Sequence, residues 1–110
     1  AYPGDERLSR ARAGETYDRG WSASGTVRHM LAVLGQPDRT KHLTKLELPV
    51  TVIHGLKDPL VHRSGGRATA AAIAGAEHIE IDGMGHDLPP ELYDTYVDAI
   101  ERTTKRAVPR

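Results

Sequence analysis

The chain has no cysteine and no phenylalanine, and a single tryptophan stands among its 110 residues. Without cysteine, it can form no disulfide bond and offers no thiolate ligand to a metal. Aromatic residues make up 5% and hydrophobic residues 38% of the sequence, so few large side chains are available to fill a core. The length is that of one small domain, and the composition gives it no surplus of core-forming residues.

The sequence also lacks an excess of either charge and any long hydrophobic run. Lys and Arg together number 15, as do Asp and Glu, so the formal net charge is zero. No basic field therefore argues for a nucleic acid or an anionic membrane as a partner. No apolar run approaches the roughly 18 residues of a membrane-spanning helix, and no signal-peptide pattern opens the chain. We expect a cytoplasmic protein that binds neither nucleic acid nor membrane.

The first half of the chain contains one strong helical pattern. Residues 1–21 are polar and have no clear period, and only residues 11–17 suggest a helix. Ser24 then precedes a run in which apolar side chains recur with helical spacing, namely Val27, Met30, Leu31 and Leu34. This pattern predicts an amphipathic helix with Ser24 as its N-cap.

The second half predicts two strands joined by a helix. Residues 49–54, PVTVIH, form a β-branched run with little alternation, which is typical of a strand buried on both faces. Residues 78–82, HIEID, form the second strand. Ser64 is the expected cap of the Ala-rich helix between them, and Gly75 is expected to end it. Strand, helix and strand together predict a right-handed βαβ crossover.

Further helical patterns flank these strands. Asp38 is the candidate cap of a short helix that carries Leu43 and Leu46. Residues 90–104 carry an apolar stripe of Leu92, Tyr96 and Ile100, and Asp87 is the candidate cap of this helix. Two parallel strands alone do not form a stable sheet, because both faces and both edges need cover. We therefore expect an α/β fold whose sheet is incomplete, and the initial Ala indicates a start inside a longer protein.

Two polar side chains follow the predicted strands at corresponding places. Asp58 comes four residues after the first strand, and His86 comes four residues after the second, in the glycine-rich turn GMGHDLP. Because the carboxyl ends of parallel strands meet at one edge of a sheet, we expect Asp58 and His86 to lie close together. A carboxylate beside an imidazole fixes its tautomer and stabilises the imidazolium formed in proton transfer. The pattern predicts a catalytic base, His86, with its orienting acid, Asp58.

The stretch LPVTVIHGLKDPLV…AEHIEIDGMGHDLP resembles the C-terminal third of an α/β-hydrolase, and GMGHDLP is most similar to actinobacterial esterase and methylesterase-like members. The resemblance covers residues 20–104 and matches Asp58 to the triad acid and His86 to the triad base. It implies the last two parallel strands of that fold with their flanking helices. Residues 1–20 would end the cap region, residues 21–104 would be the C-terminal part of the core, and residues 105–110 a tail.

The nucleophile that this resemblance implies is missing. The fold places a Ser on a G-x-S-x-G elbow between a buried strand and a helix, before the Asp and the His. The near match GWSAS would make Ser22 the nucleophile, but the polar residues before it cannot form a buried strand. The oxyanion-hole loop is absent as well. We expect the nucleophile to lie outside this chain.

Other polar candidates are weaker. His54, Asp58 and His62 are evenly spaced, but they fall on a strand, a turn and the residues after it, so no metal site is expected. His54 is expected to support the end of the strand. Asp82 and Asp87 flank His86 as alternative orienters. A lone Trp such as Trp21 usually packs, although it could line a pocket.

The sequence thus predicts the C-terminal portion of a serine-type α/β-hydrolase that acts on a small carboxylic ester without a cofactor. This chain alone would be inactive. The missing part of the fold, or another chain, would cover the sheet edge. Two alternatives stay open: a hydrolase-like fragment that serves only packing or partner binding, and a hydrolase acting on a lactone, an epoxide or a haloalkane.

Overall fold

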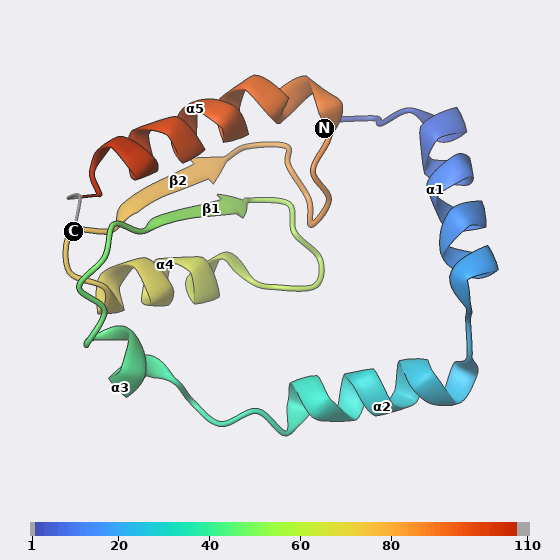
Figure 1. Ribbon diagram of the computed structural model, residues 1–110, viewed down its shortest axis with the longest axis horizontal. Coiled ribbons are helices and arrows are strands. Elements are labelled where there is room, and N and C mark those ends of the chain that lie inside the picture. The colour runs from blue at the N-terminus through green and yellow to red at the C-terminus, as the bar shows by residue number, and fades with distance from the viewer. Residues whose placement is uncertain (1, 108–110) are drawn as a thin grey trace. The chain divides into compact units, whose positions relative to one another are not determined.

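The computed structural model describes residues 2–107 (Figure 1). The described chain divides into two compact units, residues 3–38 and residues 39–107 with Tyr2. No helix of the described part is long and apolar enough to cross a membrane. Residues 108–110 of the predicted tail lie outside the described residues.

The first unit consists of two helices, α1 (Glu6–Arg19) and α2 (Ala23–Leu34). The carboxylate of Asp5 caps α1 by accepting a hydrogen bond from the Leu8 amide at 3.1 Å. The helix ends at Gly20, whose φ of 122° lies outside the range that other residues readily adopt. Helix α1 extends beyond the predicted residues 11–17 in both directions. None of its residues is buried, so its sequence shows no apolar period from which the whole helix could be predicted.

Helix α2 confirms the predicted amphipathic helix but begins at a different cap. Ser22 has extended backbone angles, and its Oγ accepts a hydrogen bond from the Gly25 amide at 2.9 Å. Ser24 already lies inside the helix, so its predicted role as N-cap is wrong. The apolar side chains of the helix are each at least half exposed: Val27, Met30, Leu31, Val33 and Leu34. The unit itself therefore leaves the apolar face of α2 uncovered.

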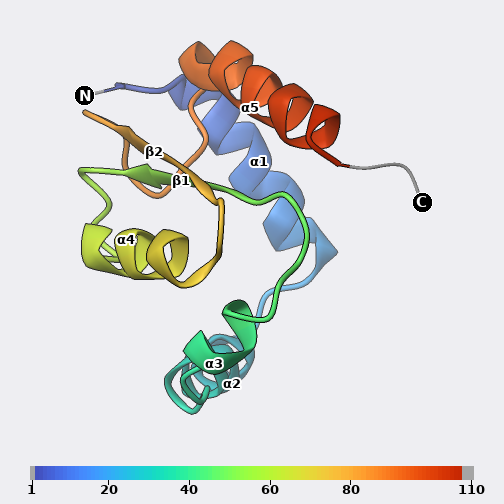
Figure 2. The same cartoon turned by 90° about the vertical axis from the view of Figure 1, so that its left-hand side faces the viewer.

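The second unit contains the predicted βαβ arrangement. Strands β1 (Thr51–Gly55) and β2 (Glu77–Ile81) pair in parallel along their whole lengths. Helix α4 (Arg63–Ala72) connects them, and α4 and α5 (Tyr93–Lys105) lie on opposite faces of the two strands (Figures 1 and 2). The mixed α/β class, with helices flanking a small parallel sheet, is confirmed.

Several predicted helix ends in this unit are wrong by a few residues. Helix α4 begins after His62, whose Nδ1 accepts a hydrogen bond from the Ser64 amide at 3.2 Å, so Ser64 is not the cap. The helix ends at Ala72, and Gly75 instead turns the chain toward β2 with a φ of 70°.

The two remaining predicted caps also differ. Helix α3 (Thr40–Leu43) begins after Arg39 rather than Asp38 and ends before Leu46. A short 3-10 helix (Pro90–Leu92) precedes α5, and neither of these two elements has a side-chain cap, so Asp87 does not cap them. Such shifts of one to three residues arise because capping depends on backbone angles as well as on residue type.

The core of the second unit is small and lies between the helices and the sheet. Its buried apolar side chains are Ile73, Met84, Leu92 and Ala99. The first strand was expected to be buried on both faces, but three of the five residues of β1 are only half buried, as is every residue of β2. A hollow of about 230 Å³ lies between parts of β1 and α5 and is lined by Ile53, Ile100 and Thr103 among others. The sheet is thus incompletely covered, as an incomplete α/β fold requires.

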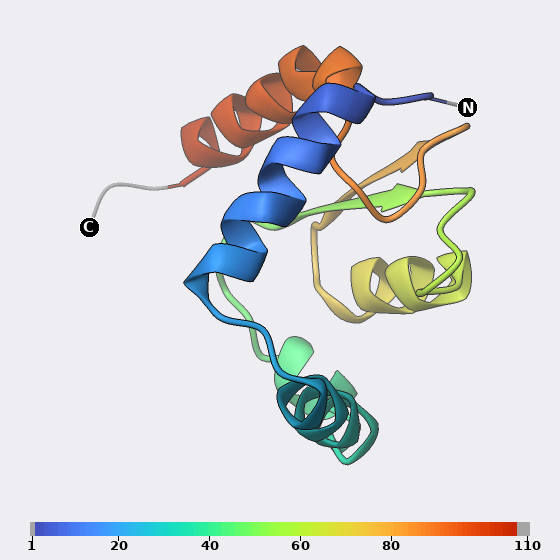
Figure 3. The same cartoon turned by 90° about the vertical axis from the view of Figure 1, so that its right-hand side faces the viewer.

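Hydrogen bonds join the amino ends of the strands to the C-terminal end of α5, which lies toward the same end of the sheet (Figure 3). The Arg106 guanidinium donates to the carbonyl oxygens of Val50 and Gly75 at 3.0 and 3.2 Å. Arg102 binds the Glu77 carboxylate at 2.8 Å, and this bond holds the pKa of Glu77 below its usual value. These bonds hold the C-terminal end of α5 at the amino ends of the strands, away from the carboxyl ends that carry Asp58 and His86.

Replacing Ser22 by Ala is expected to destabilise α2 by about 1 kcal/mol, because the amide of Gly25 loses its acceptor. Ser24→Ala is the matched control and should have a smaller effect, since Ala is favoured inside a helix. The Cα chemical shifts of α2 residues, followed with temperature, report the helix content of each variant. A larger loss in Ser24→Ala would contradict the assignment of Ser22 as the cap.

Candidate active site

The turns that follow β1 and β2 are held together by backbone hydrogen bonds. The Leu56 amide donates to the carbonyl oxygen of Ile81 at 3.0 Å, and the Lys57 amide donates to that of Met84 at 2.9 Å. The Asp58 amide closes its own turn on Gly55 at 3.1 Å. The parallel pairing of the strands therefore continues into the two loops that carry Asp58 and His86.

Gly55 permits this close approach. A Cβ atom at this position would lie 2.3 Å from the carbonyl oxygen of Gly85 and 2.4 Å from that of Met84. No side chain fits there without displacing the backbone that leads to His86. Gly83 adds a φ of 75°, which turns the chain sharply after β2.

The Asp58 carboxylate uses both of its oxygen atoms. Its Oδ1 accepts hydrogen bonds from the amides of Leu60 and Val61 at 2.8 and 2.9 Å. Its Oδ2 lies 2.9 Å from Nδ1 of His86. The pKa of Asp58 is lowered to about 2. The hydrogen bond from the Val61 amide is the largest cause, followed by the bonds to the His86 ring and the Leu60 amide, whereas burial acts in the opposite direction. Asp58 is thus ionised at neutral pH.

His86 presents one ring nitrogen to this carboxylate. Because an ionised carboxylate only accepts hydrogen bonds, Nδ1 of His86 carries the hydrogen that it donates to Asp58. In the neutral ring, Nε2 then has a free lone pair. The Asp58 side chain is 7% exposed and the His86 side chain 53%, so the acid is covered while the imidazole is open to solvent. This arrangement can accept a proton at Nε2 and stabilise the resulting imidazolium.

The expected proximity of Asp58 and His86 is therefore confirmed, while their role in catalysis stays a prediction. Asp82, an alternative candidate for orienting His86, accepts a hydrogen bond from the Gly83 amide at 2.9 Å and so stabilises the turn. His54, expected to support the strand end, is buried on β1, and its Nε2 lies 2.9 Å from the carbonyl oxygen of Val61. Among residues 2–107, no group of three acidic or His side chains is arranged to hold a metal ion.

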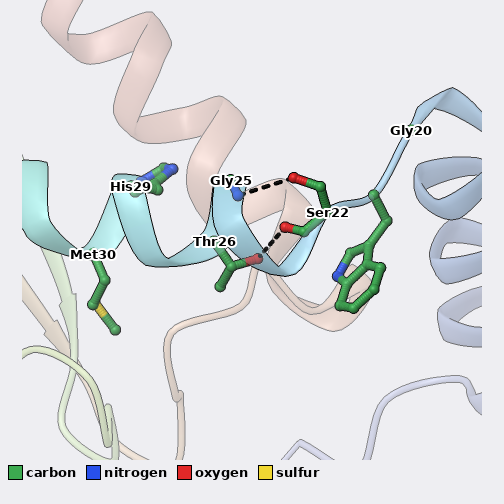
Figure 4. Close-up of a pocket in the computed structure, with 7 residues that line it drawn as sticks. Gly20, Ser22, Gly25, Thr26, His29 and Met30 are labelled. Carbon is green, nitrogen blue, oxygen red and sulfur yellow. Dashed lines mark hydrogen bonds between the residues drawn. The ribbon is translucent and has the colours of Figure 1, made fainter.

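Ser22 lies in the other unit, in surroundings unlike a nucleophile elbow. It follows helix α1 rather than a strand, and its Oγ is engaged by the Gly25 amide while its carbonyl oxygen accepts from Thr26 (Figure 4). Ser22 lines an open hollow of about 400 Å³, together with Trp21 and His29 among others. Trp21 is 66% exposed, so it lines this hollow rather than packing in a core.

Sequence reasoning missed the groups that complete the site. The amides of Leu60 and Val61 wrap the Asp58 carboxylate, and the imidazole of His54 binds the residue that supplies one of them. One signal was present: Asp followed by Pro is typical of a turn in which the carboxylate accepts amides a few residues later. The tight contact at Gly55 left no such local signal.

Among the known proteins that match this chain are two methylesterases. The chain is 33% identical over 81 residues to rhodomycin D methylesterase DnrP of Streptomyces peucetius. It is 34% identical over 83 residues to rhodomycin D methylesterase DauP of Streptomyces sp. strain C5. Each match includes 74% of this chain but only 27% of the relative, so the chain spans about a quarter of their length. No known family model matches the chain.

Gly55→Ala is expected to lower the free energy of unfolding by about 1–3 kcal/mol, because its methyl group would collide with the carbonyl oxygen of Gly85. Urea denaturation followed by circular dichroism measures the loss. The control is Gly65→Ala in α4, where the added Cβ would make an ordinary contact of 3.5 Å with the Val61 side chain. Equal stabilities of the two variants would show that the turns do not meet as described.

The ionised Asp58 should make the fold more stable above about pH 4 than in acid. Its pKa of about 2 in the folded chain lies below the ordinary value of 3.8, so the unfolded state takes up the proton first as the pH falls. This contribution is complete above the unfolded value and disappears as the pH falls through about 2. Urea denaturation of the original chain and of Asp58→Asn at a series of pH values separates the contribution of Asp58 from that of the other carboxylates. The prediction would be contradicted if the free energy of unfolding changed with pH equally steeply in both proteins.

Proposed function

We propose that this chain supplies the acid and base of a serine-type α/β-hydrolase that cleaves a carboxylic ester. The observation that carries the proposal is the 2.9 Å contact between Nδ1 of His86 and Oδ2 of Asp58, at the ends of two parallel strands. The likeness to methylesterases supports the ester as substrate and an α/β-hydrolase as the family. The nucleophilic Ser and the oxyanion hole come from residues outside this chain.

In the proposed mechanism His86 moves the proton. Its Nε2 removes the proton from the attacking Ser hydroxyl as the ester carbonyl becomes tetrahedral, and then gives it to the leaving alcohol. Water attacks the acyl-enzyme in the same way, with His86 again as base and then as acid. Asp58 stays ionised throughout, because its amide bonds lower its pKa, and it stabilises the imidazolium. These steps use no cofactor.

The missing part of the site must also complete the sheet. The described sheet has two strands, so each strand has one edge without a partner. The hollow beside Ile53 and Ile100 leaves apolar surface uncovered on the α5 side. We propose that further strands and helices of the hydrolase fold, in the same or another chain, cover these surfaces.

In the complete gene product, His86→Ala should reduce kcat for ester hydrolysis by about a thousandfold or more, because the nucleophile loses its base. Asp58→Asn should reduce kcat to a similar degree, since Asn does not hold the imidazole in the tautomer that accepts a proton. Turnover of a p-nitrophenyl ester measures both. The control is His78→Ala on β2, which removes a largely covered His at a distance from the two turns.

Retention of ester hydrolysis by His86→Ala would refute the proposal. A fluorophosphonate probe gives a second, independent measurement, because it labels an activated Ser covalently. We expect no labelling of the 110-residue chain and labelling of one Ser in the complete gene product. Labelling of Ser22 would place the nucleophile inside this chain and contradict the mechanism. Absence of any labelled Ser would favour a role in packing or partner binding.

A further inference from the structure

We infer that His54 is a positioning residue for Asp58, acting through a hydrogen bond to the carbonyl oxygen of Val61. The inference deepens the proposed function and takes its meaning for catalysis from it. It starts from the position of His54, which is 7% exposed and is the buried polar residue of the described core. A buried imidazole is retained in a small core at a cost unless its polar atoms are satisfied.

The bond made by His54 has a defined direction. Its Nε2 lies 2.9 Å from the carbonyl oxygen of Val61, and a carbonyl oxygen only accepts. Nε2 therefore carries the hydrogen and donates it. The two residues are seven positions apart, so the bond spans the whole loop that contains Asp58.

Val61 is held from both sides. Its carbonyl oxygen accepts from His54, and its amide donates to Oδ1 of Asp58 at 2.9 Å. With the Leu60 amide also on Oδ1, the second oxygen of the carboxylate is left for His86. The imidazole of His54 therefore fixes the residue whose amide orients the acid toward the base.

The imidazole of His54 packs closely against helix α4 at Gly66. A Cβ atom at Gly66 would lie 2.6 Å from Nδ1 and 3.0 Å from Cγ of His54. The imidazole therefore requires a glycine, which has no side chain, at this position of α4. Gly66 is also the buried residue of that helix. The ring therefore extends from β1, packs against α4 and directs its Nε2 at the loop that carries Asp58.

The test compares two amide side chains of different reach. In His54→Gln, the side-chain nitrogen can reach the position of Nε2 and donate to Val61, whereas in His54→Asn it falls short. Replacement by Asn should therefore raise the pKa of Asp58 from about 2 toward 3.8, and replacement by Gln should leave it near the original value. The pH dependence of the Asp58 Cγ chemical shift measures this directly in the 110-residue chain.

Amide hydrogen exchange gives a second measurement at neutral pH, where acid does not destabilise the fold. Amide hydrogen exchange of Leu60 and Val61 should accelerate about tenfold or more in His54→Asn and change little in His54→Gln, since their acceptor is no longer held. His78→Asn on β2 is the matched control. It replaces a His of the same sheet that has no bond to this loop, and both readouts should match the original chain.

Two results would overturn the inference. Unchanged Asp58 titration and amide exchange in His54→Asn would show that the bond does not orient the acid. Equal disturbance by Asn and Gln would show that ring packing against Gly66 matters instead of the bond. Neither readout depends on ester hydrolysis, so a gene product without esterase activity would refute the proposed function and leave this inference standing.

Discussion

The parallel pairing of β1 and β2 is the constraint on which the candidate site depends. It brings two loops from different parts of the sequence to one edge, where their backbones continue to bond beyond the last strand residues. Gly55 lets the loops touch, and the amides after Pro59 then direct the Asp58 carboxylate at His86. The contact between Asp58 and His86 is therefore a consequence of the strand register and of the close approach of the two loops at Gly55.

The site is well ordered by hydrogen bonds although the unit around it is lightly packed. Among the described residues, four apolar side chains and His54 are buried, whereas most strand residues are only half buried. At the amino ends of the strands, hydrogen bonds from Arg106 and Arg102 join the end of α5 to the sheet. A lightly packed unit gains stability when further apolar surface is covered. The two methylesterases are each about four times as long as the segment that matches this chain.

Much of this arrangement could be predicted from the sequence. The β-branched run, the Ala-rich segment and HIEID gave the strand–helix–strand order, and parallel connection then required Asp58 and His86 to meet. Helix α1 was largely missed, because its helical residues bury no face and leave no apolar period. The caps at Ser24, Ser64 and Asp38 were wrong, because several polar residues near each helix start can accept an amide, and only the backbone angles select one.

The sequence by itself determined the strand–helix–strand order and the proximity of Asp58 and His86, since hydrophobic periodicity and chain connectivity depend on residue types. Only the tertiary structure decided how that pair is held. The contact at Gly55, the space at Gly66 and the bond from His54 to Val61 depend on distances of a few ångströms between separate segments. No local pattern encodes such distances, because they arise when the strands, helix and loops pack together.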